Sequence, residues 1–206
     1  MTHHLGRVLA VTLAALLLLA GCGGGVHLRK PDVDLDSPAL VKLKTEARIP
    51  DCPITQPTTA PVKNGLPDVT LPCLGGGRAV HLGSLRGPMV INLWSQSCAP
   101  CRDEMPVLQR FHAKHGKKVP ILGIDWEDFQ PKLALELARD SGVTYPLAVD
   151  LDRKVKTSAL PTTILLDKRG RIVFQEPMVI GRVLDLEALV RENLGLDLGL
   201  SKTGPT

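Results

Sequence analysis

Two cysteines, Cys98 and Cys101, lie three positions apart in the stretch NLWSQSCAPCRDEMP. The apolar run at 89–94 before them has the composition of a strand buried on both faces, and the apolar spacing over 102–115 after them predicts a helix. A cysteine at the start of a helix meets the positive end of the helix dipole and free backbone N–H groups, and both favour the thiolate. A second cysteine one turn later can close a disulfide with the first and resolve a mixed disulfide. The spacing therefore predicts a thiol–disulfide redox centre.

Two other roles for this pair are weaker. A structural zinc site usually needs a second pair of ligands at similar spacing, whereas Cys52 and Cys73 stand alone and no histidine pair follows at finger spacing. A purely structural bridge across so short a loop would stabilise the fold little. Pro100 fits a helix that begins at the cysteines, because proline is tolerated in the first helical turn. We therefore expect a redox-active pair and no metal site.

The N-terminus predicts export. Residues 8–20 form an apolar run after Arg7 that is too short to cross a bilayer comfortably and matches the core of a secretory signal. The stretch LLAGC, which ends at Cys22, resembles the bacterial lipobox. That resemblance implies cleavage before Cys22, lipidation of its thiol, and an extracytoplasmic protein that is lipid-anchored to the bacterial cell membrane. The alternative is ordinary signal cleavage, which would leave Cys22 an unmodified thiol.

The remaining cysteines suit this location, because disulfides persist outside the cytoplasm. Once Cys22 carries lipid and Cys98 pairs with Cys101, Cys52 and Cys73 are left. An even remainder is typical of an exported chain whose cysteines are all used. We expect a structural disulfide between Cys52 and Cys73.

Composition and length predict one folded domain. We expect a lipoprotein signal at 1–21, a tether rich in Pro, Asp, Lys and Thr at 22–62, the domain at 63–196 and a flexible tail at 197–206. The net charge is +4, with both signs mixed along the chain. A nucleic-acid surface would need clustered lysine and arginine, so we expect no nucleic-acid partner.

The order of the predicted elements indicates the fold class. Two short strands around a GGG turn form an N-terminal hairpin, and buried strands at 119–125 and 145–150 enclose a helix at 131–142. A second hairpin spans 162–176, and a helix at 185–193 closes the domain. Strands that alternate with helices predict an α/β fold with a central, partly parallel sheet covered on both faces.

Four stretches together carry a family resemblance. NLWSQSCAPCRDEMPVL, ILGIDWED, YPLAVDLD and ALPTTILLDKRGRIV, in this order within residues 66–194, resemble the TlpA/ResA branch of the thioredoxin-fold proteins. The resemblance implies a thioredoxin-like fold, with a central mixed sheet flanked by helices, an extra helix–strand insertion at 131–150 and an N-terminal hairpin. It also implies a membrane-anchored, extracytoplasmic thiol–disulfide oxidoreductase of the kind that often serves cytochrome c maturation.

Positions that match the family's motifs imply the roles of individual residues. Cys98 matches the exposed attacking thiol and Cys101 the buried resolving thiol, while Trp94 matches the family tryptophan. Pro161 matches the cis-proline beside the disulfide. A cis bond there would place the backbone of Leu160 where an extended substrate strand could pair with it.

One departure and one ambiguity accompany the resemblance. Ser97 stands where the family often has tryptophan or another bulky residue, which implies less apolar cover over Cys98. Some members carry a glutamate near the cysteines, and both Glu127 and Asp128 match its place. Such a carboxylate could take the proton of the resolving thiol. The alternative is a solvated acidic loop.

The direction of electron transfer stays open between two thiol–disulfide roles. Pro100 between the cysteines, as in reducing thioredoxins, and the absence of a basic residue there favour a reductant of oxidised protein substrates such as apocytochrome c. A reductant in an oxidising compartment needs a transmembrane electron-donor protein, and we expect no cofactor. The rival role is a protein disulfide oxidase. A thiol peroxidase would need a Pro-x-x-x-Thr/Ser-x-x-Cys setting that Cys98 lacks, and a copper-delivery lipoprotein would need a wider cysteine spacing and a later histidine.

Overall fold

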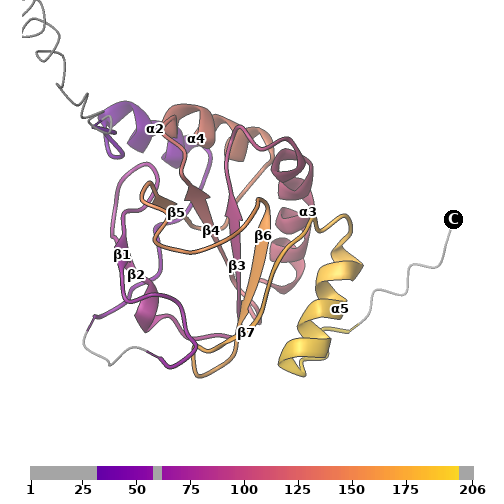
Figure 1. The fold of residues 1–206 in the computed structure, drawn as a ribbon. Helices are drawn as coiled ribbons and strands as arrows, with labels where there is room; N and C mark the ends of the chain where they lie inside the picture. The colour runs from indigo at the N-terminus through magenta and orange to yellow at the C-terminus, as the bar shows by residue number, and fades with distance from the viewer. Residues whose placement is uncertain (1–31, 58–61, 200–206) are drawn as a thin grey trace, which may run out of the picture. The chain divides into compact units, whose positions relative to one another are not determined.

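A five-stranded mixed sheet forms the centre of the fold (Figure 1). The computed structural model describes residues 32–57 and 62–199. The strand order is β5-β4-β3-β6-β7, in which β3, β4 and β5 are parallel, β6 is antiparallel to β3, and β7 is antiparallel to β6. The strands are β3 (Met89–Trp94), β4 (Ile121–Trp126), β5 (Leu147–Asp150), β6 (Thr162–Leu166) and β7 (Ile172–Pro177). The insertion and both hairpins predicted from the sequence are present, so the predicted thioredoxin-like architecture is confirmed.

The helices pack on one face of this sheet. They are α2 (Pro38–Glu46), α3 (Ala99–His115), α4 (Pro131–Asp140) and α5 (Val183–Leu194), and each contributes side chains to one apolar core. Val90 and Trp94 of β3 face this core, whereas Ile91 and Leu93 face the opposite one. Side chains alternate between the two faces of a strand, so β3, which is apolar at every position except Asn92, is buried on both sides.

A small N-terminal hairpin covers the second face. It pairs β1 (Thr70–Leu71) with β2 (Val80–His81), and a short 3₁₀ helix (Leu82–Ser84) follows. Leu71, Val80 and Leu82 pack there against β3, β4 and β6. The predicted sheet with two covered faces is therefore found, with helices over one face and the hairpin with its loops over the other.

The segment expected to be a tether is only partly described, and that part differs from the expectation. Within residues 22–62, α2 packs against α4, and Leu40 and Ile49 are buried in the helix-side core. Pro38 starts this short helix, and Leu40 and Leu43 on its inner face pack into the helix-side core. Residues 1–31, which include the expected signal and Cys22, and 200–206, which make up most of the expected tail, lie outside the described residues.

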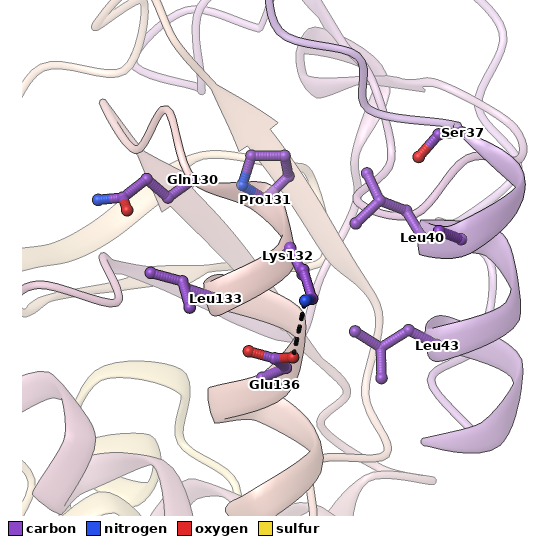
Figure 2. A pocket seen from close by; sticks show the side chains of 9 residues that line it. Ser37, Leu40, Leu43, Gln130, Pro131, Lys132, Leu133 and Glu136 are labelled. Atoms are coloured by element: carbon purple, nitrogen blue, oxygen red, sulfur yellow. Dashed lines mark ion pairs between the residues drawn. The ribbon is translucent and has the colours of Figure 1, made fainter.

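A groove separates α2 from α4 at the surface (Figure 2). It has a volume of about 460 Å³, and Leu40, Leu43, Pro131 and Leu133 supply most of its apolar lining. An ion pair of 3.7 Å joins Lys132 to Glu136 beside it. Within residues 32–57 and 62–199, no helix has the length and hydrophobicity needed to span a membrane.

Candidate redox site

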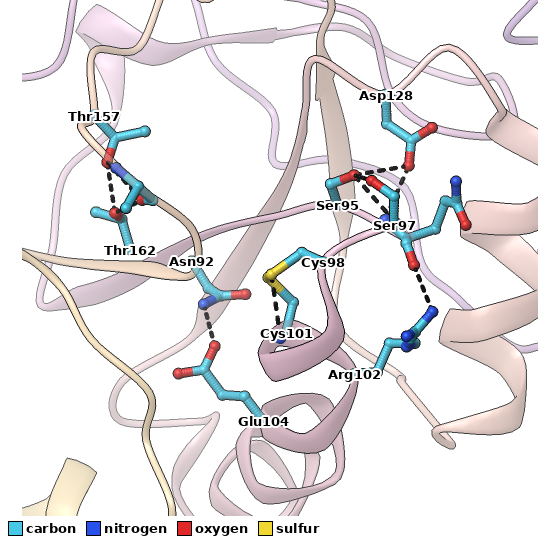
Figure 3. Close-up of a disulfide and its surroundings, with 12 residues drawn as sticks. Asn92, Ser95, Ser97, Cys98, Cys101, Arg102, Glu104, Asp128, Thr157 and Thr162 are labelled. Atoms are coloured by element: carbon cyan, nitrogen blue, oxygen red, sulfur yellow. Dashed lines mark hydrogen bonds between the residues drawn. A yellow bond between two sulfur atoms is a disulfide. The ribbon is translucent and has the colours of Figure 1, made fainter.

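Cys98 and Cys101 form a disulfide at the start of α3 (Figure 3). The sulfur–sulfur distance is 1.99 Å and the Cα atoms are 5.3 Å apart. Strand β3 ends at Trp94, a short loop follows, and Cys98 is the N-cap residue of the helix with extended backbone angles. Pro100 occupies the first turn, where its missing N–H has no helical partner to lose. The predicted strand–cysteine–helix arrangement is thus present.

The two sulfurs occupy different environments. Cys101 is fully buried, whereas Cys98 is partly exposed and its neighbours Ser97, Ala99 and Pro100 are exposed. The backbone N–H of Cys101 lies 3.3 Å from the Cys98 sulfur, which accepts it. That N–H and the helix dipole would stabilise a thiolate on Cys98 in the reduced protein. A second molecule can therefore reach the sulfur of Cys98 but not that of Cys101.

Pro161 lies at the same end of the sheet as the cysteine pair. The Leu160–Pro161 bond is cis, as expected from the family resemblance. Thr162, the first residue of β6, pairs with Leu93 near the end of the antiparallel strand β3. Because the start of one antiparallel strand lies beside the end of its neighbour, Pro161 and the residues that follow β3 lie at the same end of the sheet. Leu160 is partly buried there, while Trp94 is fully buried in the helix-side core.

The two acids considered from the sequence separate clearly. Asp128 is buried and its Oδ2 accepts the backbone N–H of Gln96 at 2.9 Å and the hydroxyl of Ser95 at 3.3 Å. It therefore holds the loop that leads into Cys98. Glu127 instead pairs with the guanidinium of Arg153, which also lies 5.3 Å from the centre of the Trp126 ring.

The structure brings a third acid to the pair, Glu104, which the sequence reasoning missed. Glu104 lies three residues after Cys101 on α3 and is 1 % exposed. Its carboxylate accepts hydrogen bonds from the Ile180 N–H at 2.8 Å and from the Asn92 side chain at 2.9 Å. Burial raises the pKa of Glu104 to about 7, although both hydrogen bonds act in the opposite direction. The sequence does contain a signal for Glu104. It is an acid one helical turn after the second cysteine, at a position that faces into the protein.

Figure 3 places Asn92 with Glu104 on one side of the disulfide and Asp128 with Ser95 on the other. A further buried acid, Asp125, lies on β4 opposite Trp94 in the strand register. Burial and then the negative charge of Asp128 raise the pKa of Asp125 well above its ordinary value. Asp125 therefore holds its proton more tightly than an exposed aspartate, and it too was not expected from the sequence.

Known proteins share this arrangement of elements. A model of the AhpC/TSA family matches residues 62–175. The chain belongs to the AhpC/TSA family. The thiol–disulfide oxidoreductase ResA of Geobacillus thermodenitrificans is 34% identical over 125 residues, which cover 57% of this chain and 70% of that relative. ResA of Bacillus subtilis is 31% identical over 103 residues, which cover 47% and 57% of the two chains.

Two solved structures of 28% identity resemble this AhpC/TSA family member. The DsbF homologue of Corynebacterium diphtheriae covers 68% of this chain and 91% of its own, with a TM-score of 0.54. The secreted thiol-disulfide isomerase of Corynebacterium glutamicum covers 63% and 83%, with a TM-score of 0.53. The chain is accordingly an AhpC/TSA family protein of thioredoxin-like fold and a thiol–disulfide oxidoreductase of the ResA type.

Proposed function

We propose that Cys98 and Cys101 are the catalytic cysteines and that the protein reduces disulfides in extracytoplasmic proteins while anchored to the membrane through lipid on Cys22. The asymmetry of the pair carries the proposal, since Cys98 is partly exposed at a helix N-terminus and Cys101 is buried behind it.

The reaction proceeds by thiol–disulfide exchange. The Cys98 thiolate attacks one sulfur of a substrate disulfide, the substrate's other sulfur leaves as a thiolate, and a mixed disulfide forms. Cys101 then loses its proton and attacks the Cys98 sulfur. The substrate leaves as a dithiol. The two electrons it gained come from Cys98 and Cys101, which are now oxidised to a disulfide.

Two carboxylates support these steps in different ways. Glu104 is one helical turn from Cys101 and its pKa of about 7 suits a group that accepts a proton from a thiol near neutral pH. Asp128 positions the loop before Cys98 through its bonds to Gln96 and Ser95. Glu127, paired with Arg153, has a weaker claim to either role.

The backbone beside Pro161 supplies the substrate surface in this proposal. Leu160 and Pro161 lie at the end of the sheet that also carries the cysteine pair. An extended peptide could pair with the backbone of Leu160 beside the cysteine pair, with main-chain hydrogen bonds for affinity. Such binding fits protein substrates, and the oxidised apocytochrome c is the candidate that the TlpA/ResA resemblance supplies.

The cellular setting follows from the same proposal. Likeness to a secreted thiol-disulfide isomerase and the export signal in the sequence both support a location outside the cytoplasm. A reductant there is reoxidised continually, so a transmembrane protein must return electrons to Cys98 and Cys101. We assign no cofactor, because the exchange needs only the two thiols.

The reduction potential of the Cys98–Cys101 couple tests the direction of transfer. A value near that of thioredoxin, about −270 mV, is expected of the reductant. The purified protein should also accelerate the reduction of insulin by a dithiol. A value near about −120 mV, with efficient oxidation of reduced, unfolded substrates, would instead assign the protein disulfide oxidase role.

A further inference from the structure

The second disulfide, Cys52–Cys73, has a buried lysine beside it. The Nζ atom of Lys44 lies 3.7 Å from the Cys73 sulfur, and the Lys44 side chain is only 7% exposed. The same ammonium donates hydrogen bonds of 2.7 Å to Asp51 Oδ1 and 2.7 Å to the Gly76 carbonyl. Lysine is almost never fully buried without partners, so its charge is fixed at this place by three neighbours, one of which is a disulfide sulfur.

The GGG turn is shaped around this lysine. Gly76 and Gly77 have φ of +79° and +96°, which L side chains rarely adopt. A Cβ at Gly77 would lie 2.5 Å from Asp51 Oδ1 and 3.3 Å from Lys44 Nζ. Side chains in this turn would therefore displace the ion pair, and the glycines serve the lysine contact as well as the hairpin.

The environments of the two sulfurs differ. The Cys73 sulfur accepts the Cys52 N–H at 3.1 Å and faces the Lys44 ammonium. The Leu147 carbonyl oxygen lies 3.3 Å from the Cys73 sulfur and 3.4 Å from the Cys52 sulfur. This oxygen contacts both sulfurs and can accept an S–H from either. The difference between the sulfurs comes from the Cys52 N–H and the Lys44 ammonium, which among the described residues contact the Cys73 sulfur. After reduction, Cys52 therefore suits the protonated thiol and Cys73 the thiolate.

We propose that the Cys52–Cys73 disulfide is a second thiol-exchange site, which reacts with low-molecular-mass thiols and in which Lys44 stabilises Cys73 as the leaving thiolate. A thiolate of the small molecule attacks the Cys52 sulfur, the Cys52–Cys73 bond breaks, and Cys73 departs as a thiolate. A second small thiolate then attacks the small molecule's sulfur in the mixed disulfide, and Cys52 leaves. The products are the small-molecule disulfide, the Cys73 thiolate and Cys52, which takes up one proton.

A hollow at the surface lies beside the lysine, although neither cysteine lines it. It has a volume of about 540 Å³, and its lining includes Lys44, Asp51 and the glycine turn. Both cysteines are nearly covered, at 3% and 2% exposure for Cys52 and Cys73. Because a folded protein could not reach sulfurs covered to this degree, the proposal takes a small thiol as the partner, which passes the glycine turn to reach Cys52.

The charged groups around the site determine how far the Cys73 thiolate is stabilised. Lys44 comes from α2, Asp51 from the loop after it, and Arg78 acts on Asp51 from the turn before β2. A hydrogen bond from Lys44 and then its positive charge lower the pKa of Asp51. Asp51 remains anionic at neutral pH and shares the lysine with Cys73, so Lys44→Met should remove the stabilisation of the thiolate and Asp51→Asn should increase it.

The test uses the full chain with Cys98→Ser and Cys101→Ser, which leaves this disulfide as the exchanging one and keeps the result separate from the proposed catalytic pair. The protein is equilibrated with mixtures of reduced and oxidised dithiothreitol, quenched, alkylated, and analysed by peptide mass spectrometry at Cys52 and Cys73. Lys44→Met should shift the equilibrium toward the disulfide by about tenfold, or about 30 mV. Lys44→Arg should retain most of the native value. Lys42→Met changes an exposed lysine on the same helix, with a 76% exposed side chain, and should leave the equilibrium unchanged.

A second measurement does not depend on a Lys44 variant that folds. In the reduced protein, the rate of Cys73 alkylation should rise at a lower pH than that of Cys52, because Cys73 ionises first. Equal pH profiles for the two thiols, or the same exchange equilibrium in folded Lys44→Met as in the native protein, would overturn the proposal and leave the bond purely structural.

Discussion

The side-chain amide of Asn92, on the strand that leads to the cysteine pair, donates a hydrogen bond of 2.9 Å to the carboxylate of Glu104, on the helix that follows the pair. Both residues are 1% exposed. Removing either partner would leave a buried polar group without its bond, which costs about 1–3 kcal/mol. The contact thus joins β3 to α3 beneath the disulfide and holds an acid next to Cys101 that titrates near neutral pH.

Glu104→Gln should remove a pH dependence of stability. The pKa of Glu104 is raised from 4.5 to about 7 by burial, so the folded state holds this proton more tightly than the unfolded state. That contribution is complete below the unfolded pKa and is lost as the pH rises through about 7, and its full size is of the order of 3 kcal/mol. Chemical denaturation at about pH 5 and about pH 8 should show the loss in the native protein and a flatter profile in Glu104→Gln.

The exposed Glu192 provides the matched control for that measurement. Glu192→Gln should keep the native pH profile, because it leaves the buried contact between Asn92 and Glu104 in place. If Glu104→Gln kept it as well, another group would be responsible for the dependence.

Cys101→Ser should trap substrates, whereas Cys98→Ser should not. With Cys101 replaced, the partly exposed Cys98 still attacks a substrate disulfide, but no buried thiol follows to release the product. Non-reducing electrophoresis and mass spectrometry of a reaction with insulin should detect adducts on Cys98 of the Cys101→Ser protein. Adducts that form instead on Cys101 of the Cys98→Ser protein would reverse the assigned roles.

Asp128→Ala should slow insulin reduction and destabilise the protein. The substitution removes the buried acceptor of the Gln96 N–H, and loss of a hydrogen bond to a charged group costs about 1.5–3 kcal/mol. The released loop would no longer fix the position of Cys98. Glu127→Ala removes only the partly exposed ion pair with Arg153, for which about 0–1 kcal/mol is expected. Similar losses of activity in both variants would show that Asp128 has no special role in the loop.

Replacing Cys52 and Cys73 together by serine should lower stability by about 3 kcal/mol on the chain-entropy model, since the two are 21 residues apart in the sequence. Denaturant titration of the oxidised proteins measures the difference. The double variant should still show exchange at Cys98 and Cys101, which lie in a separate disulfide. Loss of both the folded state and the exchange at Cys98 and Cys101 would mean that the domain needs the cross-link to fold.

Cys22→Ser should leave the exported chain unprocessed or free of the membrane. The LLAGC stretch supplies the expectation, since the thiol of Cys22 would be the site of lipid attachment. Cell fractionation and intact-mass spectrometry of the native protein and the variant report retention and lipid mass. Unchanged membrane retention of Cys22→Ser would contradict the anchor.

Local patterns in the sequence were sufficient for the redox motif and for most elements. The strand before Cys98 is apolar at nearly every position, and helix start, dipole and cysteine spacing act over a few residues. The hairpins likewise follow from alternation and turn residues next to one another in the chain. These features depend on residues that are close together in the chain, so the sequence is enough to predict them.

The tertiary structure decided which charged groups serve the two disulfides. Nothing in the residue type distinguishes Glu104 from a surface glutamate. Its packing against Asn92 and Ile180 in the folded protein buries it, and burial raises its pKa. Lys44 and Cys73 are 29 residues apart, so their contact exists only because a supposed tether folds as α2 and docks. Burial and charge proximity depend on distances between segments far apart in the chain, and the folded core sets those distances.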